Sequence, residues 1–243
     1  MLSKNEIKFL RTFHQKKFRD REQKLLVEGE RIIHDLLHRH KNTVENVYVS
    51  RGFKGDLSFS EDIHVIELER QVFEQLSASK NPQGIMALIA YPEFCFQDVP
   101  CILVLDGIQD PGNMGTILRT AAWFGIDQIV CSNDTVDVCN PKVVQSSMGS
   151  VYDLNICYDD LASFLVKQKK PIYGAILGGT SIYQIKMEQP GILVLGNEGN
   201  GISESIKNHI NHAVLIPKIG FGESLNVASA TAIFLSEWNR VGK

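Results

Sequence analysis

The sequence predicts an α/β protein of two domains, the second of which is built on a parallel sheet. In the second half of the chain, strand-like and helix-like segments follow one another in strict succession, which is typical of parallel strands covered by helices on both faces. Ahead of this half, residues 91–100 carry Pro92 and Pro100 and show no apolar periodicity, as expected of a linker. We therefore expect one domain at 1–95 and another at 96–243.

The first domain is expected to be a small α/β unit. Its apolar residues cluster or alternate where strands are predicted and recur every three or four residues where helices are predicted. The predicted helices are 5–12, 30–38 and 70–76, and the predicted strands are 24–27, 44–49, 62–68 and 84–90.

The second domain repeats this alternation over a longer stretch. The predicted strands are 101–106, 128–132, 171–176, 191–195 and 213–216, and the predicted helices are 114–124, 141–147, 159–168, 203–209 and 226–239. The last helix has an apolar stripe of Val227, Ala230, Phe234 and Trp238, so it must pack against the rest of the domain.

Composition is that of an ordinary globular protein, with 44% hydrophobic and 22% charged residues among 243. No apolar run approaches the roughly 20 residues that cross a bilayer, and the first residues lack the apolar core of a secretory signal. We expect a soluble, cytoplasmic protein. The five cysteines are odd in number and have no C-x-x-C spacing, so we expect neither a metal site nor disulfides.

Charge is unevenly distributed along the chain. Residues 1–24 hold eight basic and three acidic side chains, which gives a local charge of +5. Because the net charge of the chain is −3, the remaining residues carry −8. A concentrated basic segment suits binding to a phosphate backbone, and we take Lys16, Lys17 and Arg19 as candidate contacts to such a backbone. From the residues alone, a solvated amphipathic helix with its phenylalanines in the core is an equal alternative.

Three polar, glycine-containing segments follow predicted strands of the second domain. Residues 113–119 read N-M-G-T-I-L-R, residues 195–203 read L-G-N-E-G-N-G-I-S, and Ile216-Pro217 is followed at 223–228 by E-S-L-N-V-A. Because the carboxyl ends of parallel strands meet at one edge of a sheet, we expect these segments to form one site.

In this order and spacing, the three segments resemble the motifs of the SpoU/TrmH family of RNA ribose 2′-O-methyltransferases, which belongs to the SPOUT class. Residues 17–31 and 81–84 are similar to that family's substrate-binding domain, so the resemblance covers nearly the whole chain. The resemblance implies a deep trefoil knot in the second domain, S-adenosylmethionine as cofactor and a homodimer.

The resemblance also implies roles for individual residues. The catalytic group is expected to be Asn113, Arg119, Glu198, Ser224 and Asn226. The cofactor is expected to contact Leu195, Gly196, Asn197, Gly199, Ile216, Pro217 and Leu225.

Structural roles compete with these assignments when each residue is considered alone. Arg119 is the only charged residue between Asp110 and Asp127, and it could form a salt bridge with Asp106 or Asp110. Asn113 stands where a helix N-cap belongs, and capping is the simpler interpretation of its side chain.

The other two segments have structural alternatives as well. A glycine-rich segment such as the one around Glu198 is more often a plain tight turn. Ser224 or Asn226 could cap the final helix, and the chain lacks the G-x-S-x-G elbow that a serine hydrolase would need.

The expected reaction is methyl transfer from S-adenosylmethionine to a ribose 2′-hydroxyl of RNA. Ribosomal RNA is the first choice because the N-terminal region resembles the version found with ribosomal-RNA members, and transfer RNA is the alternative. A non-catalytic RNA-binding or ribosome-assembly protein is a further alternative, which the joint presence of the five catalytic-type residues disfavours.

Overall fold

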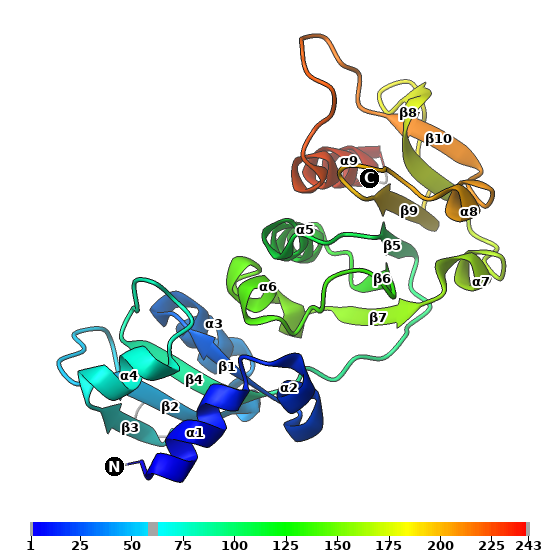
Figure 1. Ribbon diagram of the computed structural model, residues 1–243. Helices are drawn as coiled ribbons and strands as arrows, with labels where there is room; N and C mark the ends of the chain where they lie inside the picture. Colours follow the sequence, from blue (N-terminus) through cyan, green and yellow to red (C-terminus); the bar gives the residue numbers. More distant parts are fainter. Residues whose placement is uncertain (1, 58–62, 242–243) are drawn as a thin grey trace. The chain divides into compact units, whose positions relative to one another are not determined.

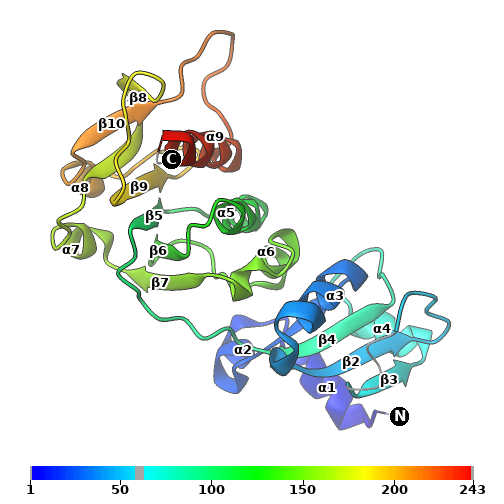
Figure 2. The same cartoon turned by 180° about the vertical axis from the view of Figure 1, so that it is seen from behind.

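The computed structural model describes residues 2–57 and 63–241, and the chain forms two compact units (Figures 1 and 2). The first unit contains the residues up to Pro92 together with Cys139–Tyr152. The second contains Glu93–Val138 and the residues from Asp153 onward. The division at Pro92 lies beside the predicted boundary, whereas the assignment of 139–152 to the first unit was not foreseen.

The first unit is a four-stranded sheet with helices on both faces (Figure 1). The strand order is β1-β4-β2-β3, with β4 antiparallel to both neighbours and β2 parallel to β3. Its elements are α1 (Lys4–Thr12), α2 (Lys16–Glu22), β1 (Lys24–Glu28), α3 (Glu30–Arg39), η1 (Lys41–Thr43), β2 (Val44–Ser50), β3 (Val65–Leu68), α4 (Arg70–Leu76), β4 (Ile85–Ala90), α6 (Pro141–Ser146) and η3 (Ser150–Tyr152).

Alternation along the strands of this sheet separates two apolar layers. Leu26, Tyr48, Met86 and Leu88 pack with side chains of α1 and α4 in one cluster. The intervening residues of the same strands are also buried, as expected of a sheet with both faces covered.

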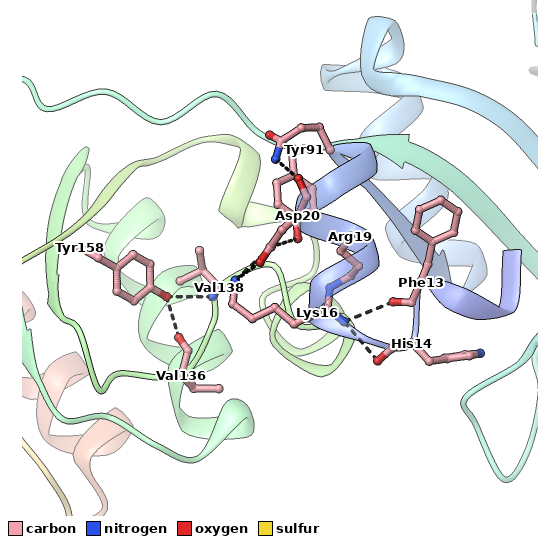
Figure 3. Close-up of polar contacts among 10 residues, drawn as sticks. Phe13, His14, Lys16, Arg19, Asp20, Tyr91, Val136, Val138 and Tyr158 are labelled. Atoms are coloured by element: carbon pink, nitrogen blue, oxygen red, sulfur yellow. Dashed lines mark hydrogen bonds and ion pairs between the residues drawn. The ribbon is translucent and has the colours of Figure 1, made fainter. Parts of the chain in front are cut away.

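Helix α2 was not predicted from the sequence, and it turns part of the basic segment inward. Arg19 is only 3% exposed, and its guanidinium donates hydrogen bonds of 3.2 Å to the carbonyls of Phe13 and His14 (Figure 3). Asp20, on the same helix, accepts hydrogen bonds from Lys16 and from the Tyr91 hydroxyl. Phe13 is fully buried. The alternative interpretation of this segment, an amphipathic helix with its phenylalanines in the core, therefore holds for Phe13.

The second unit contains a six-stranded sheet in which every neighbouring pair is parallel, as predicted. The strand order is β10-β8-β9-β5-β6-β7. Its elements are β5 (Cys101–Asp106), α5 (Pro111–Trp123), β6 (Gln128–Ser132), β7 (Asn155–Asp159), α7 (Leu161–Leu165), β8 (Ile172–Ser181), β9 (Gly191–Gly196), α8 (Glu204–Lys207), β10 (His212–Leu215) and α9 (Val227–Val241).

Helices cover both faces of this sheet (Figures 1 and 2). Helices α5 and α9 lie side by side on one face, and α7 and α8 lie on the other. The central strands supply alternate residues to each layer, so that Ile102, Val104, Ile192 and Val194 pack with side chains of α7 and α8. The predicted apolar stripe of the last helix is confirmed at Phe234 and Trp238, which are 2% and 0% exposed.

Strand β7 was missed by the sequence analysis, and β8 is longer than predicted. β7 is an edge strand with a mixed burial pattern, and its Tyr158 hydroxyl binds the backbone of Val136 and Val138 (Figure 3).

Of the predicted strand 62–68, residue 62 lies outside the described residues. Threading of the chain into a knot stays a prediction. None of the helices in the described part of the chain is long and apolar enough to span a membrane.

Candidate active site

The predicted motifs meet at the centre of the parallel sheet, where β5 and β9 lie side by side. From β5 the chain continues through α5 to β6 on one side, and from β9 it continues through α8 to β10 on the other. Adjacent parallel strands whose connections leave in opposite directions open a crevice at their carboxyl ends, which is where open α/β sheets bind ligands. The crevice between β5 and β9 is therefore the candidate active site.

The first motif begins helix α5. Asp110 is the N-cap, since its side chain accepts a 2.8 Å hydrogen bond from the Asn113 backbone N–H, and Pro111 occupies the first turn. The interpretation of Asn113 as the cap is therefore wrong, because Asp110-Pro111 already carries the usual cap-then-proline start. This leaves the Asn113 side chain available for contacts outside its own helix.

The second motif is a tight turn held by Asn197. The Asn197 and Gly201 backbones exchange two hydrogen bonds, and the Asn197 side-chain oxygen accepts from the N–H groups of Gly199 and Asn200. Gly196 just before the turn allows the chain to close, because a Cβ there would lie 2.2 Å from the carbonyl carbon of Gly201. The turn projects the exposed Glu198 from its tip.

The third motif ends at the start of helix α9. The Asn226 side-chain oxygen accepts hydrogen bonds from the backbone N–H groups of Ala228 and Ser229, at 2.9 and 3.3 Å. Asn226 is therefore the N-cap of α9, and the sequence interpretation of this residue as a cap is confirmed. Ser224 does not share that role.

A chain of side-chain hydrogen bonds joins the three motifs. Asn226 Nδ2 donates to Asn113 Oδ1 at 2.8 Å, and Asn113 Nδ2 donates to Glu198 Oε1 at 2.6 Å. The orientation of both amides is determined, because the carboxylate only accepts and the Asn226 oxygen is already committed to backbone donors. We refer to Asn113, Glu198 and Asn226 as the motif triad.

Two further contacts, which the sequence analysis did not single out, tie the end of β9 to the end of β5. Asn197 Nδ2 donates to the Gly107 carbonyl at 2.8 Å, and Asp106 Oδ2 accepts the Ser203 N–H at 2.7 Å. Gly107 has φ +69, a left-handed conformation that favours glycine. The Asn197 side chain thus forms its hydrogen bonds within the protein, and its contact with the cofactor stays a prediction.

Arg119 and Ser224 are not part of the motif triad. Both are exposed, and neither side chain forms a hydrogen bond or ion pair with residues 2–57 or 63–241. The alternative salt bridge of Arg119 with Asp106 or Asp110 is absent from this described part. Arg119 lies six residues beyond Asn113 on α5, about 9 Å along the helix axis. Its guanidinium therefore remains available for a ligand.

The segment between β10 and α9 has the chemistry that an adenosyl cofactor requires. Within residues 2–57 and 63–241, no backbone group of residues 216–225 takes part in a backbone–backbone hydrogen bond. Leu225 is 53% exposed, while Ile216 and Pro217 are half-buried at the end of β10. In this segment the Gly222 carbonyl accepts a hydrogen bond from Lys218 Nζ at 2.9 Å. Main-chain donors and acceptors beside apolar side chains can recognise an adenine ring, so the segment is compatible with S-adenosylmethionine.

A cavity of about 260 Å³ lies at the carboxyl ends of β5, β6 and β7. It is lined by Asp106, Asp134, Asp159 and Asp160 among others and by none of the five predicted catalytic residues. Four carboxylates repel a phosphate backbone, so this cavity does not suit the RNA.

The candidate RNA contacts differ among themselves. Lys16 is exposed and pairs with Asp20 at 2.7 Å, and the exposed Lys17 lies over the Phe18 ring at 4.9 Å. Both amines can reach solvent. Arg19 is buried against backbone carbonyls, as described above, and cannot meet a phosphate in this conformation, so we do not retain it as an RNA contact.

Comparison with known proteins agrees with the motifs. Residues 100–236 match the model of the SpoU rRNA Methylase family, and residues 4–87 match the MRM3-like substrate binding domain. The chain belongs to the SpoU rRNA methylase family. The family predicted from the sequence is thus confirmed, and with it an S-adenosylmethionine-dependent RNA methyltransferase.

Individual relatives match along nearly the whole chain. A protein of Bacillus subtilis named 23S rRNA (guanosine(2553)-2′-O)-methyltransferase RlmP is 30% identical over 96% of both chains. A putative RNA methyltransferase of the TrmH family from Porphyromonas gingivalis is 39% identical, with a TM-score of 0.83 over 99% of both chains. An AdoMet-bound rRNA methyltransferase from Sinorhizobium meliloti has the same TM-score at 25% identity, covering 99% of this chain and 96% of its own.

Proposed function

We propose that this protein transfers a methyl group from S-adenosylmethionine to a ribose 2′-hydroxyl of ribosomal RNA. The observation that carries the proposal is the motif triad, in which three segments far apart in the sequence converge beside the β5–β9 crevice. Family membership and the name of the B. subtilis relative support both the chemistry and the RNA class.

The cofactor supplies a methyl group on a positively charged sulfur, so a new C–O bond forms while the C–S bond breaks and its electron pair goes to sulfur. The protein therefore has to align the hydroxyl and assist loss of its proton. In our proposal the hydroxyl proton leaves to solvent water. In this proposal the cofactor is held by the turn after β9 and the segment after β10, through Leu195, Gly196, Asn197, Gly199, Ile216, Pro217 and Leu225.

Arg119 acts on the RNA as a cation in this proposal. A guanidinium keeps its proton at neutral pH and can only donate hydrogen bonds, so it is unsuited to act as a base. It holds the phosphate next to the target ribose and lowers the proton affinity of the hydroxyl. Its exposure and lack of protein partners within the described residues support this role.

The motif triad fixes the geometry around that hydroxyl. Glu198 is the charged member, and its second carboxylate oxygen, Oε2, has no hydrogen bond in the described part of the chain. Ser224, exposed near the start of α9, completes the polar side chains available to the substrate.

We further propose that the first unit binds the RNA through Lys16 and Lys17, and that the protein works as a cytoplasmic homodimer. Trp123, which is 84% exposed at the end of α5, is a residue that such a dimer could cover. Light scattering of the purified protein tests the dimer.

The function is tested with Arg119→Ala and with ribosomal RNA from cells that lack the protein. The variant should lose methyl transfer by at least about 100-fold, as expected when transition-state contacts are removed. Calorimetry should show nearly unchanged affinity for S-adenosylmethionine. Lys186→Ala, which removes another exposed cation of the second unit, is the matched control and should keep full turnover.

Undiminished turnover in Arg119→Ala contradicts the assigned role. Mapping of ribose methylation then identifies the RNA: a site missing from ribosomal RNA supports the proposal, and a site missing only from transfer RNA favours the alternative. Absence of S-adenosylmethionine binding would favour a non-catalytic RNA-binding protein.

A further inference from the structure

The first unit contains a cavity of about 350 Å³ at one end of its sheet, away from the predicted contacts on α2. It is bounded by the end of β2, the start of β4 and helix α4. The lining residues that carry chemistry are Arg51, Phe53, Lys54, Arg70, Glu74 and Gln83.

Glycines keep this cavity open. Gly52 and Gly84 adopt φ +82 and +81, which side chains other than hydrogen rarely allow. A Cβ at Gly84 would come within 3.2 Å of the Phe53 ring, so a larger residue there would crowd the aromatic side chain. Hydrogen bonds from Ser50 to the Gly84 carbonyl and from Phe53 to the Ser50 carbonyl, at 2.8 and 2.9 Å, fix the backbone around it.

The lining contains three cations, Arg51, Lys54 and Arg70, and one acid, Glu74. Arg70 is paired with Glu74 at 2.9 Å, and Arg51 is paired with Glu67 and Glu69. Lys54 is exposed and has no hydrogen bond or ion pair within the described ranges. Its amine can therefore bind an anion without breaking a salt bridge.

The half-buried Phe53 ring and the neighbouring Lys54 amine are suited to binding a nucleotide. Single-stranded nucleic acids bind through bases stacked on aromatic rings and phosphates paired with Lys or Arg. A cavity of 350 Å³ is of a size to take one nucleotide and is too small for a duplex.

We propose that this cavity holds one unpaired nucleotide of the RNA, with its base stacked on Phe53 and its phosphate bound by Lys54. The inference rests on the proposed function, since it assigns a contact of the same RNA substrate. It gives the first unit a means of preferring RNA with an unpaired loop over a continuous duplex.

The test measures binding of the full-length protein to an RNA hairpin with a single-stranded loop, to a duplex of equal length, and to adenosine monophosphate. Phe53→Ala should weaken hairpin binding about tenfold, within the range found for loss of a stacked base. Phe53→Trp should restore it, and Phe53→Leu, which keeps an apolar side chain without a π face, should not. Lys54→Ala should lower affinity and reduce the salt slope by about 0.7, the contribution of one phosphate on a single strand.

Lys169→Ala, which removes an exposed lysine of the second unit, is the charge-matched control and should bind like the natural protein. The duplex should bind more weakly and be insensitive to the Phe53 variants. If Phe53→Ala does not fold, as judged by circular dichroism, the comparison of Phe53→Leu with Phe53→Trp carries the test.

Hairpin affinity unchanged in Phe53→Leu and in Lys54→Ala overturns the proposal. Tighter binding of adenosine monophosphate than of the hairpin overturns the assignment to RNA. Calorimetry with S-adenosylmethionine and methyl transfer are measured on the same variants. If the Phe53 and Lys54 variants methylate RNA and bind it like the natural protein, only the nucleotide site in this cavity is contradicted. If RNA binding depends on Phe53 but the natural protein transfers no methyl group, only the proposed function is contradicted.

Discussion

The Asn113 side-chain amide donates a 2.6 Å hydrogen bond to the carboxylate of Glu198, which lies 85 residues later in the chain. This contact joins the start of α5 to the turn after β9. Because Asn113 also accepts from Asn226, a change at any one of the three positions alters the orientation of the other two. The effects of such changes should therefore be non-additive.

Two substitutions of Asn226 should differ in their effects on stability and on methyl transfer. Asn226→Asp keeps the oxygen that caps α9 but places a second acceptor opposite Asn113 Oδ1, so methyl transfer should fall while the cap is kept. Asn226→Ala removes both contacts and should also lose about 1 kcal/mol of stability through loss of the cap. Urea unfolding and turnover, measured on both variants, check this prediction. Equal stability of the two variants would contradict the capping role.

Gly196→Ala should open the turn after β9. The added Cβ would lie 2.2 and 2.3 Å from backbone atoms of Gly201 and Ile202, and backbone cannot rotate aside as a side chain can. We expect a loss of about 1–3 kcal/mol in stability, with much weaker binding of S-adenosylmethionine by calorimetry. Gly220→Ala is the control, since a Cβ there meets nothing within 4 Å and should leave stability unchanged.

Asp20 should make the free energy of unfolding of the first unit depend on pH. Partial burial acts to raise the pKa of Asp20, but hydrogen bonds from Lys16 and Tyr91 outweigh it and the pKa lies below its usual value of 3.8. A lowered folded-state pKa stabilises the protein above about pH 4 and loses that stabilisation as the pH falls through the folded pKa.

Asp20→Asn should remove this part of the pH dependence, with an effect below about 1 kcal/mol because the pair is exposed. Thermal unfolding between about pH 6 and pH 3 measures it. Tyr91→Phe removes one of the two donors and should give an intermediate profile. A profile of Asp20→Asn that matches the natural protein would show that these hydrogen bonds do not stabilise the fold.

Thiol reactivity should follow burial. Cys95 is exposed, whereas Cys131 is completely buried and burial raises the pKa of its thiol well above the usual value. Burial also raises the pKa of Cys101 and Cys157. At about pH 8, iodoacetamide should modify Cys95 first and Cys131 only after unfolding, as mass spectrometry can show. Equal rates for the two would contradict the packing of β6.

Most of the fold was predictable because the parallel strands are long apolar runs separated by helices. Strand β7 was missed because it lies at the sheet edge, where only part of Asn155–Asp159 is buried and the apolar signal is short. The grouping of 139–152 with the first unit depends on contacts between segments far apart in the chain, which local periodicity does not encode.

Of the predicted catalytic residues, the structure joins Asn113, Glu198 and Asn226, while the roles of all five stay predictions. The alternative role of Asn113 as a helix cap is excluded because Asp110-Pro111 already starts the helix, whereas Asn226 combines capping with a contact to Asn113. Arg19 illustrates the remaining limit: a basic residue in a basic segment can be turned inward by a helix that its own polar sequence does not predict.

Because Asn226 caps the last helix, the polar constellation is completed only by a segment that is synthesised after both α5 and the turn after β9. A nascent chain that has emerged only as far as β10 already carries the asparagine and the glutamate but lacks the group that orients them. The motif triad therefore cannot form before the chain has been translated beyond residue 226.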